Sequence, residues 1–135
     1  MAFLNFTDKL SVKIGIIDEQ HKILISIIND LHDAMVAGKG RIAIYDTLIR
    51  LIDYTKMHFA MEQRLMAQYG YPERKTHETQ HQELVNQVDE LDRKVKAGQT
   101  TVTIETMDFL KKWLNHHILQ TDHKFGEFLV TKGLQ

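Results

Sequence analysis

The chain has 135 residues, 17 of them lysine or arginine and 18 aspartate or glutamate, and this near-neutral balance without a long basic run argues against a nucleic-acid partner. The absence of cysteine excludes disulfides, thiolate metal sites and thiol nucleophiles. No apolar run reaches the roughly 18 residues that a transmembrane helix needs. The first residues also lack the basic segment followed by an apolar block that is typical of a signal peptide. We therefore expect a cytoplasmic protein with no transmembrane segment.

Few helix-breaking residues interrupt the sequence. Gly38, Gly70 with Pro72, and Gly98 divide the chain into four long segments. Within each segment apolar residues recur at three and four positions, which is the period of an α-helix. The sequence therefore predicts an all-α fold, an up-down-up-down antiparallel four-helix bundle with short connections, formed by a single domain over residues 1–135.

The first 17 residues look extended, and we expect this N-terminal segment to wrap across one end of the bundle. Asp18 is a predicted N-cap of the first helix, with Glu19 in its first turn, where the helix dipole favours an anion. Thr103 and Glu105 are predicted to begin the fourth helix.

Histidine and carboxylate side chains lie on the apolar faces of the predicted helices. His21 leads the apolar stripe of the first helix, and His58 and Glu62 face the core one turn apart on the second. On the third helix His77 and His81 are four residues apart, so both imidazoles can reach one metal ion.

The fourth helix contributes His117 and Asp122, whose spacing of five residues places them about 140° apart on a regular α-helix. If both face one site, either a π-like turn near residues 119–121 brings them together, or Asp122 reaches the site from the side of the helix. We favour the second arrangement, because a carboxylate that bridges two metal ions lies off-centre between them.

Buried imidazoles and carboxylates with no lysine or arginine among them are costly unless they are paired or bound to metal. Any single histidine on an apolar face is more often a hydrogen-bonded core residue. Ligand types that face inward from all four helices are hard to explain in this way. The pattern therefore predicts a metal site.

The pattern resembles the hemerythrin family, specifically its single-domain bacterial members. The likeness spans nearly the whole chain and includes the blocks Ile17-Asp18-Glu19-Gln20-His21, His58-Phe59-x-x-Glu62 and Trp113-Leu114-x-x-His117-Ile118. All seven ligand positions of the family are filled, namely His21, His58, Glu62, His77, His81, His117 and Asp122. Phe6 stands where many relatives carry tryptophan, and Gln63 stands where a second glutamate is common. These two differences affect only the packing and the tuning of the metal site by residues around the ligands.

The resemblance implies a non-haem di-iron centre with two iron ions per chain, bridged by Glu62, Asp122 and an oxo or hydroxo group. It implies that this centre binds dioxygen reversibly and is not an enzyme. His77, His81 and His117 would hold one iron, and the other would keep an open position. If both irons are octahedral, five imidazoles, two bridging carboxylates and the oxygen bridge fill all positions but one. The expected lining of the oxygen pocket is Leu24, Phe59, Leu114 and Ile118.

Other functions remain alternatives. Di-iron oxidases use mostly glutamate with Glu-x-x-His on two helices, a motif that no core stripe of this chain carries. A structural zinc site needs four ligands, so seven would be a surplus. Sensing of nitric oxide or redox state could use the same open position. We expect a monomer that stores, delivers or senses oxygen, with an oxygen-consuming enzyme as a candidate recipient.

Overall fold

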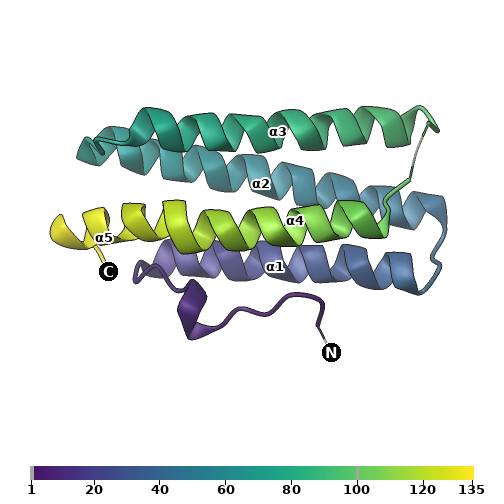
Figure 1. The fold of residues 1–135 in the computed structure, drawn as a ribbon, viewed down its shortest axis with the longest axis horizontal. Helices are drawn as coiled ribbons and strands as arrows, with labels where there is room; N and C mark the ends of the chain where they lie inside the picture. The colour runs from purple at the N-terminus through teal and green to yellow at the C-terminus, as the bar shows by residue number, and fades with distance from the viewer. Residues whose placement is uncertain (1, 100) are drawn as a thin grey trace.

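The computed structural model describes residues 2–99 and 101–135, and in these residues all regular secondary structure is helical. Four long helical segments lie side by side and alternate in direction (Figure 1). They are α1 (Gly15–Val36), α2 (Arg41–Tyr69), α3 (Arg74–Lys96) and a fourth segment built from α4 (Ile104–His116), the π-helix η2 (His117–Asp122) and α5 (His123–Thr131). The predicted all-α, up-down-up-down bundle is confirmed. Within the described residues, no helix combines the length and the apolar character needed to cross a membrane.

The helices end where the glycines predict. Gly38, Gly70 and Gly98 have φ angles of 66°, 67° and 76°, a left-handed conformation that glycine adopts without steric cost. At the start of α4 the Thr103 side chain accepts a hydrogen bond from the Thr106 backbone N–H at 3.2 Å, so Thr103 is the predicted N-cap. These local signals set the lengths of the helices.

The antiparallel order brings one group of helix ends together. The start of α1, the end of α2, the start of α3 and the end of the fourth segment lie at the same end of the bundle (Figure 1). Side chains that are far apart in the sequence can therefore meet in the core near that end. The rest of the core is apolar and includes Leu31, Leu48 and Met107, none of which has solvent exposure.

The start of α1 differs from the prediction. The helix begins at Gly15, so residues 15–17 are helical and Asp18 lies in the first turn rather than at the N-cap. The Asp18 carboxylate instead accepts hydrogen bonds from the Ser11 hydroxyl at 2.6 Å and from the Val12 backbone N–H at 2.9 Å. Asp18 thus ties the N-terminal segment to α1.

The N-terminal segment also takes a different course from the predicted one. It contains the short 3₁₀-helix η1 (Asp8–Leu10) and runs along the side of α1 instead of across one end of the bundle (Figure 1). The Asn29 side chain on α1 explains this course, because it pairs with both backbone groups of Leu4 at 2.8 and 2.9 Å. A side-chain amide that pairs with the backbone of a distant segment in this way cannot be predicted from a hydrophobic pattern.

At Gly126 on α5 the N-terminal segment packs closely against the bundle. A Cβ atom at this position would lie 2.8 Å from the Cβ of Val12 and closer still to the Val12 carbonyl oxygen. We expect Gly126→Ala to lower the free energy of unfolding by about 2 kcal/mol, because the backbone of the segment must move away. Chemical denaturation would measure the loss. Gly15→Ala, where the nearest atom is 3.7 Å away, is the control, and equal stability of the two variants would contradict the prediction.

Candidate metal centre

Seven polar side chains from all four helical segments meet inside the bundle. Each of them is 2% exposed or less, and none is a lysine or arginine. One comes from α1 and two each from α2, α3 and η2, in the order His21, His58, Glu62, His77, His81, His117 and Asp122. The structure thus brings together all seven residues that the sequence singled out.

Glu62 lies between two groups of histidines. Its Oε1 is 3.1 Å from Nε2 of His81 and 3.6 Å from Nε2 of His77. Its Oε2 is 3.5 Å from Nε2 of His58 and 4.0 Å from Nε2 of His21. One carboxylate oxygen therefore faces each group.

Asp122 repeats this arrangement. Its Oδ1 is 2.9 Å from Nε2 of His77 and 3.1 Å from Nε2 of His117, whereas its Oδ2 is 3.1 Å from Nε2 of His21. The two sets of donors share both carboxylates, and within each set the donor atoms lie within 4.8 Å of one another. The sets are Glu62, His77, His81, His117 and Asp122, and His21, His58, Glu62 and Asp122.

The donor atoms fit a metal better than a hydrogen-bond network. All four carboxylate oxygens, and Nε2 of every histidine in the cluster except His58, are buried without a hydrogen-bond partner in the described part of the chain. Unpaired buried polar atoms are rare and costly. Imidazole nitrogens and carboxylate oxygens are ligands that iron binds readily. The cluster is therefore metal-capable, and its two overlapping donor sets are compatible with a di-iron site.

The charges in the cluster favour a bound cation. Burial by itself would raise the pKa of Asp122, but His117, His21 and His77 hold that pKa well below its usual range. Burial lowers the pKa of His58 to about 4, which leaves its imidazole neutral and able to donate an electron pair. Despite its burial, His77 has a pKa raised to about 9 by Asp122 and Glu62. The two carboxylates thus attract positive charge.

The π-helix η2 explains the spacing of five residues between His117 and Asp122. In a π-helix the backbone hydrogen bond closes at i+5, so the side chain at i+5 lies above that at i. Both residues are buried and face the cluster together. Our preferred interpretation, a regular helix with Asp122 reaching from its side, is wrong, and the π-turn alternative is what the structure contains.

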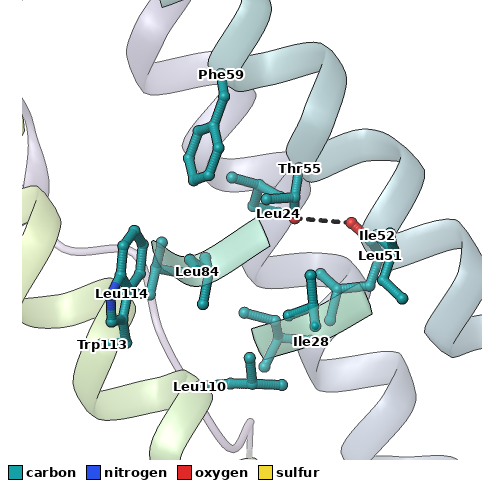
Figure 2. A pocket seen from close by; sticks show the side chains of 11 residues that line it. Leu24, Ile28, Leu51, Ile52, Thr55, Phe59, Leu84, Leu110, Trp113 and Leu114 are labelled. Carbon is teal, nitrogen blue, oxygen red and sulfur yellow. Dashed lines mark hydrogen bonds between the residues drawn. The ribbon is translucent and has the colours of Figure 1, made fainter. Parts of the chain in front are cut away.

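An apolar cavity of about 30 Å³, shown in Figure 2, lies beside the cluster. Phe59 links the two, since it lines the cavity and stacks on the His81 ring with centroids 3.7 Å apart. The Thr55 hydroxyl is satisfied by the Leu51 carbonyl at 2.7 Å, as the dashed line in Figure 2 shows. The remaining lining side chains are Leu24, Ile28, Leu51, Ile52, Leu84, Val88, Leu110, Trp113 and Leu114. Ile118 is fully buried but does not line the cavity.

Two glutamines at the site were missed by the sequence reasoning. The Gln20 amide oxygen is 2.6 Å from Nδ1 of His58, and that of Gln80 is 3.0 Å from Nδ1 of His117. Their position in the sequence could have pointed to them, because each glutamine immediately precedes a candidate ligand on its own helix. Their contacts to neighbouring helices could not be read from spacing.

Comparison with known proteins identifies the family. A family model described as the hemerythrin HHE cation-binding domain matches residues 12–129. The chain belongs to the hemerythrin family. It is 35% identical over 130 residues to a bacteriohemerythrin of Methylococcus capsulatus, with 96% of this chain and 98% of the relative covered. It is 38% identical over 122 residues to a bacteriohemerythrin of Pseudomonas aeruginosa strain LESB58, with 90% and 78% covered.

Solved structures of hemerythrins have the same fold. The crystal structure of a wild-type hemerythrin matches this bundle with a TM-score of 0.89 at 35% identity, covering 95% of this chain and 98% of the other. A point mutant of hemerythrin matches with a TM-score of 0.92 at 34% identity, covering 96% and 98%. The predicted family membership and the four-helix architecture are both confirmed.

Proposed function

We propose that this hemerythrin binds dioxygen reversibly at two non-haem iron ions held by the seven buried side chains. The single observation that carries the proposal is the sharing of Glu62 and Asp122, each with one oxygen toward either set of histidines. Carboxylates in such positions can bridge two cations, with an oxo or hydroxo group as the third bridge. Bound iron supplies the redox chemistry by which dioxygen is held.

The two sets of donors differ in number, which supports one open position. One set has five donors, three of them histidines, and the other has four, of which His21 and His58 are the histidines. We propose that the position for dioxygen lies on the side of His21 and His58. This half of the cluster has fewer protein donors, so it leaves more room for an added ligand.

The side chains around the cluster favour reversible binding over turnover. The cavity lined by Leu24, Phe59 and Leu114 is apolar and has room for one small apolar molecule. We propose that dioxygen passes through it, with the buried Ile118 closing the core nearby. Five histidines and only two carboxylates also carry less negative charge than the glutamate-rich sites of di-iron oxidases. We therefore propose a binding protein and not an enzyme.

Metal analysis and spectra under changing oxygen test the proposal. After anaerobic loading with Fe²⁺ we expect two iron ions per chain, and a visible absorption band that appears under oxygen and disappears under vacuum over repeated cycles. One metal ion per chain, or zinc retained by a protein that does not bind iron, would overturn the di-iron assignment. Steady consumption of dioxygen through the cycles would instead indicate an oxidase.

The wider role follows from this binding function. We propose that residues 1–135 form one hemerythrin domain that stores, delivers or senses oxygen. A monomeric state, a cytoplasmic location and an oxygen-consuming enzyme as recipient stay predictions of the sequence.

A further inference from the structure

Gln20 and Gln80 hold equivalent places in the bundle. Each immediately precedes a proposed iron ligand of its own helix, His21 on α1 or His81 on α3. Each points its amide oxygen at a histidine on a neighbouring helical segment. Gln20 meets Nδ1 of His58 on α2 at 2.6 Å, and Gln80 meets Nδ1 of His117 on η2 at 3.0 Å.

The chemistry of an amide oxygen determines what these contacts do. Because such an oxygen can only accept a hydrogen bond, the Nδ1 atoms of His58 and His117 must carry the proton. When the ring is neutral, its Nε2 atom then presents an electron pair to a metal ion. For His117 this atom faces the carboxylates, with Nε2 3.1 Å from Oδ1 of Asp122. Nδ1 of His21, His77 and His81 has no such partner among the described residues.

Gln80 makes a second side-chain contact. Its amide oxygen also accepts a hydrogen bond from the Thr121 hydroxyl at 2.7 Å. The Gln80 amide oxygen on α3 therefore binds both His117, the first residue of the π-helix, and Thr121, the residue just before its end. On its own segment the His117 ring is stacked on Trp113 with centroids 4.5 Å apart. The π-helical turn is thus held by hydrogen bonds to α3 and by ring stacking within its own helical segment.

We propose that Gln80 is a positioning residue that fixes the Nδ1–H tautomer of His117 and holds the π-helical turn through which Asp122 enters the cluster. Gln20 performs the first of these tasks for His58. The role rests on the proposed di-iron function for its purpose, but the tautomer and the turn are properties of the protein without metal. Outer hydrogen bonds of this kind orient metal-binding histidines and strengthen metal binding.

The first test uses metal-free protein, so that it does not depend on iron chemistry. Long-range ¹H–¹⁵N NMR reports which ring nitrogen of each histidine carries the proton. We expect a proton on Nδ1 of His117 in the wild type and a mixture of protonation at the two ring nitrogens in Gln80→Leu, which lacks an acceptor. Gln80→Glu keeps an acceptor and should restore the Nδ1–H form. Retention of that form in Gln80→Leu would overturn the proposal.

Gln82→Leu is the matched control for general damage to α3. Gln82 is an exposed residue of the same helix, and its side chain donates to the Asn86 amide oxygen at 2.8 Å. Its replacement by leucine removes one side-chain hydrogen bond of a glutamine on α3 that does not contact the cluster. We expect the His117 tautomer to be unchanged in this variant. A changed tautomer would show that the effect of Gln80→Leu is not specific.

Thr121→Val tests whether Gln80 holds the π-helical turn, separately from its effect on the His117 tautomer. This variant also provides a test if Gln80→Leu fails to fold. The variant keeps the hydrogen bond to His117 and removes the one from the hydroxyl. We expect the normal tautomer of His117, but faster amide hydrogen exchange across residues 117–122. Exchange as slow as in the wild type would overturn the role of this contact in holding the turn.

The second test measures release of iron from Fe²⁺-loaded protein to an excess of chelator. We expect release from Gln80→Leu to be about 10–100 times faster than from the wild type, and release from Gln80→Glu and Gln82→Leu to be close to the wild-type rate. Equal rates in all four proteins would overturn a role of Gln80 in metal binding. If the tautomer changes as expected but no variant binds iron, the proposed function fails and the positioning of His117 stands.

Discussion

Replacing Glu62 by glutamine is expected to lower the iron content from the proposed two ions per chain to less than one. Glu62 belongs to both sets of donors and directs one oxygen toward each. The amide has nearly the same shape, but it carries no charge and has one oxygen, so it cannot bridge two cations. Elemental analysis of protein loaded with Fe²⁺ and freed of loose metal would measure the change.

Two controls separate loss of the bridge from loss of the fold. Glu19→Gln removes the same charge from an exposed position, where the side chain is 69% exposed, and should leave two iron ions bound. Metal-free Glu62→Gln should still give the helical circular dichroism spectrum and the cooperative unfolding of a folded bundle, because the substitution conserves volume. If Glu62→Gln keeps two iron ions, the bridging role is wrong.

Removing the His81 ring is expected to abolish stable binding of iron by the set that contains His77 and His117. It should also destabilise the metal-free protein. The ring is stacked on Phe59 with an interplanar angle of 3° and is 1% exposed, so His81→Ala leaves a cavity in the core. We expect the free energy of unfolding to fall by about 2–4 kcal/mol. Chemical denaturation and metal analysis would measure the two effects.

A volume-conserving variant separates these two effects. His81→Leu fills the space without a donor atom, so it should lose iron as His81→Ala does but keep more of its stability. His116→Ala replaces an exposed histidine beside a proposed ligand and should change neither property. Iron content equal to that of the wild type in His81→Ala and His81→Leu would remove His81 from the ligand set.

Much of the cluster could be predicted because helix geometry links spacing to direction. Two residues four apart lie on one face, so His77 and His81 must share a side of their helix wherever it packs. The same rule holds for His58 and Glu62, and all four are buried as the apolar stripes predict. Burial of many donors without cationic side chains then indicates metal. No knowledge of the neighbouring helices is needed for these steps.

The fourth segment shows where this rule fails. The sequence places His117 and Asp122 five residues apart, which allows two backbone geometries with the same residues. Contacts from another helix accompany the π-helix, since Gln80 binds both His117 and Thr121. These contacts cannot be predicted from the sequence of the fourth segment alone. The less favoured of two stated geometries was therefore the correct one.

The sequence by itself determined the helix period, the helix ends at glycines and the inward direction of the polar side chains other than Asp122, because these depend on residues within a few turns of one another. Only the tertiary structure decided how the carboxylate oxygens divide between the histidines, where the N-terminal segment runs and which side chains border the cavity. Asn29 pairs with Leu4 across 25 residues, and Gln20 with His58 across 38. Such contacts form only when the packing of apolar faces has already brought distant segments together, so their partners cannot be read from local spacing.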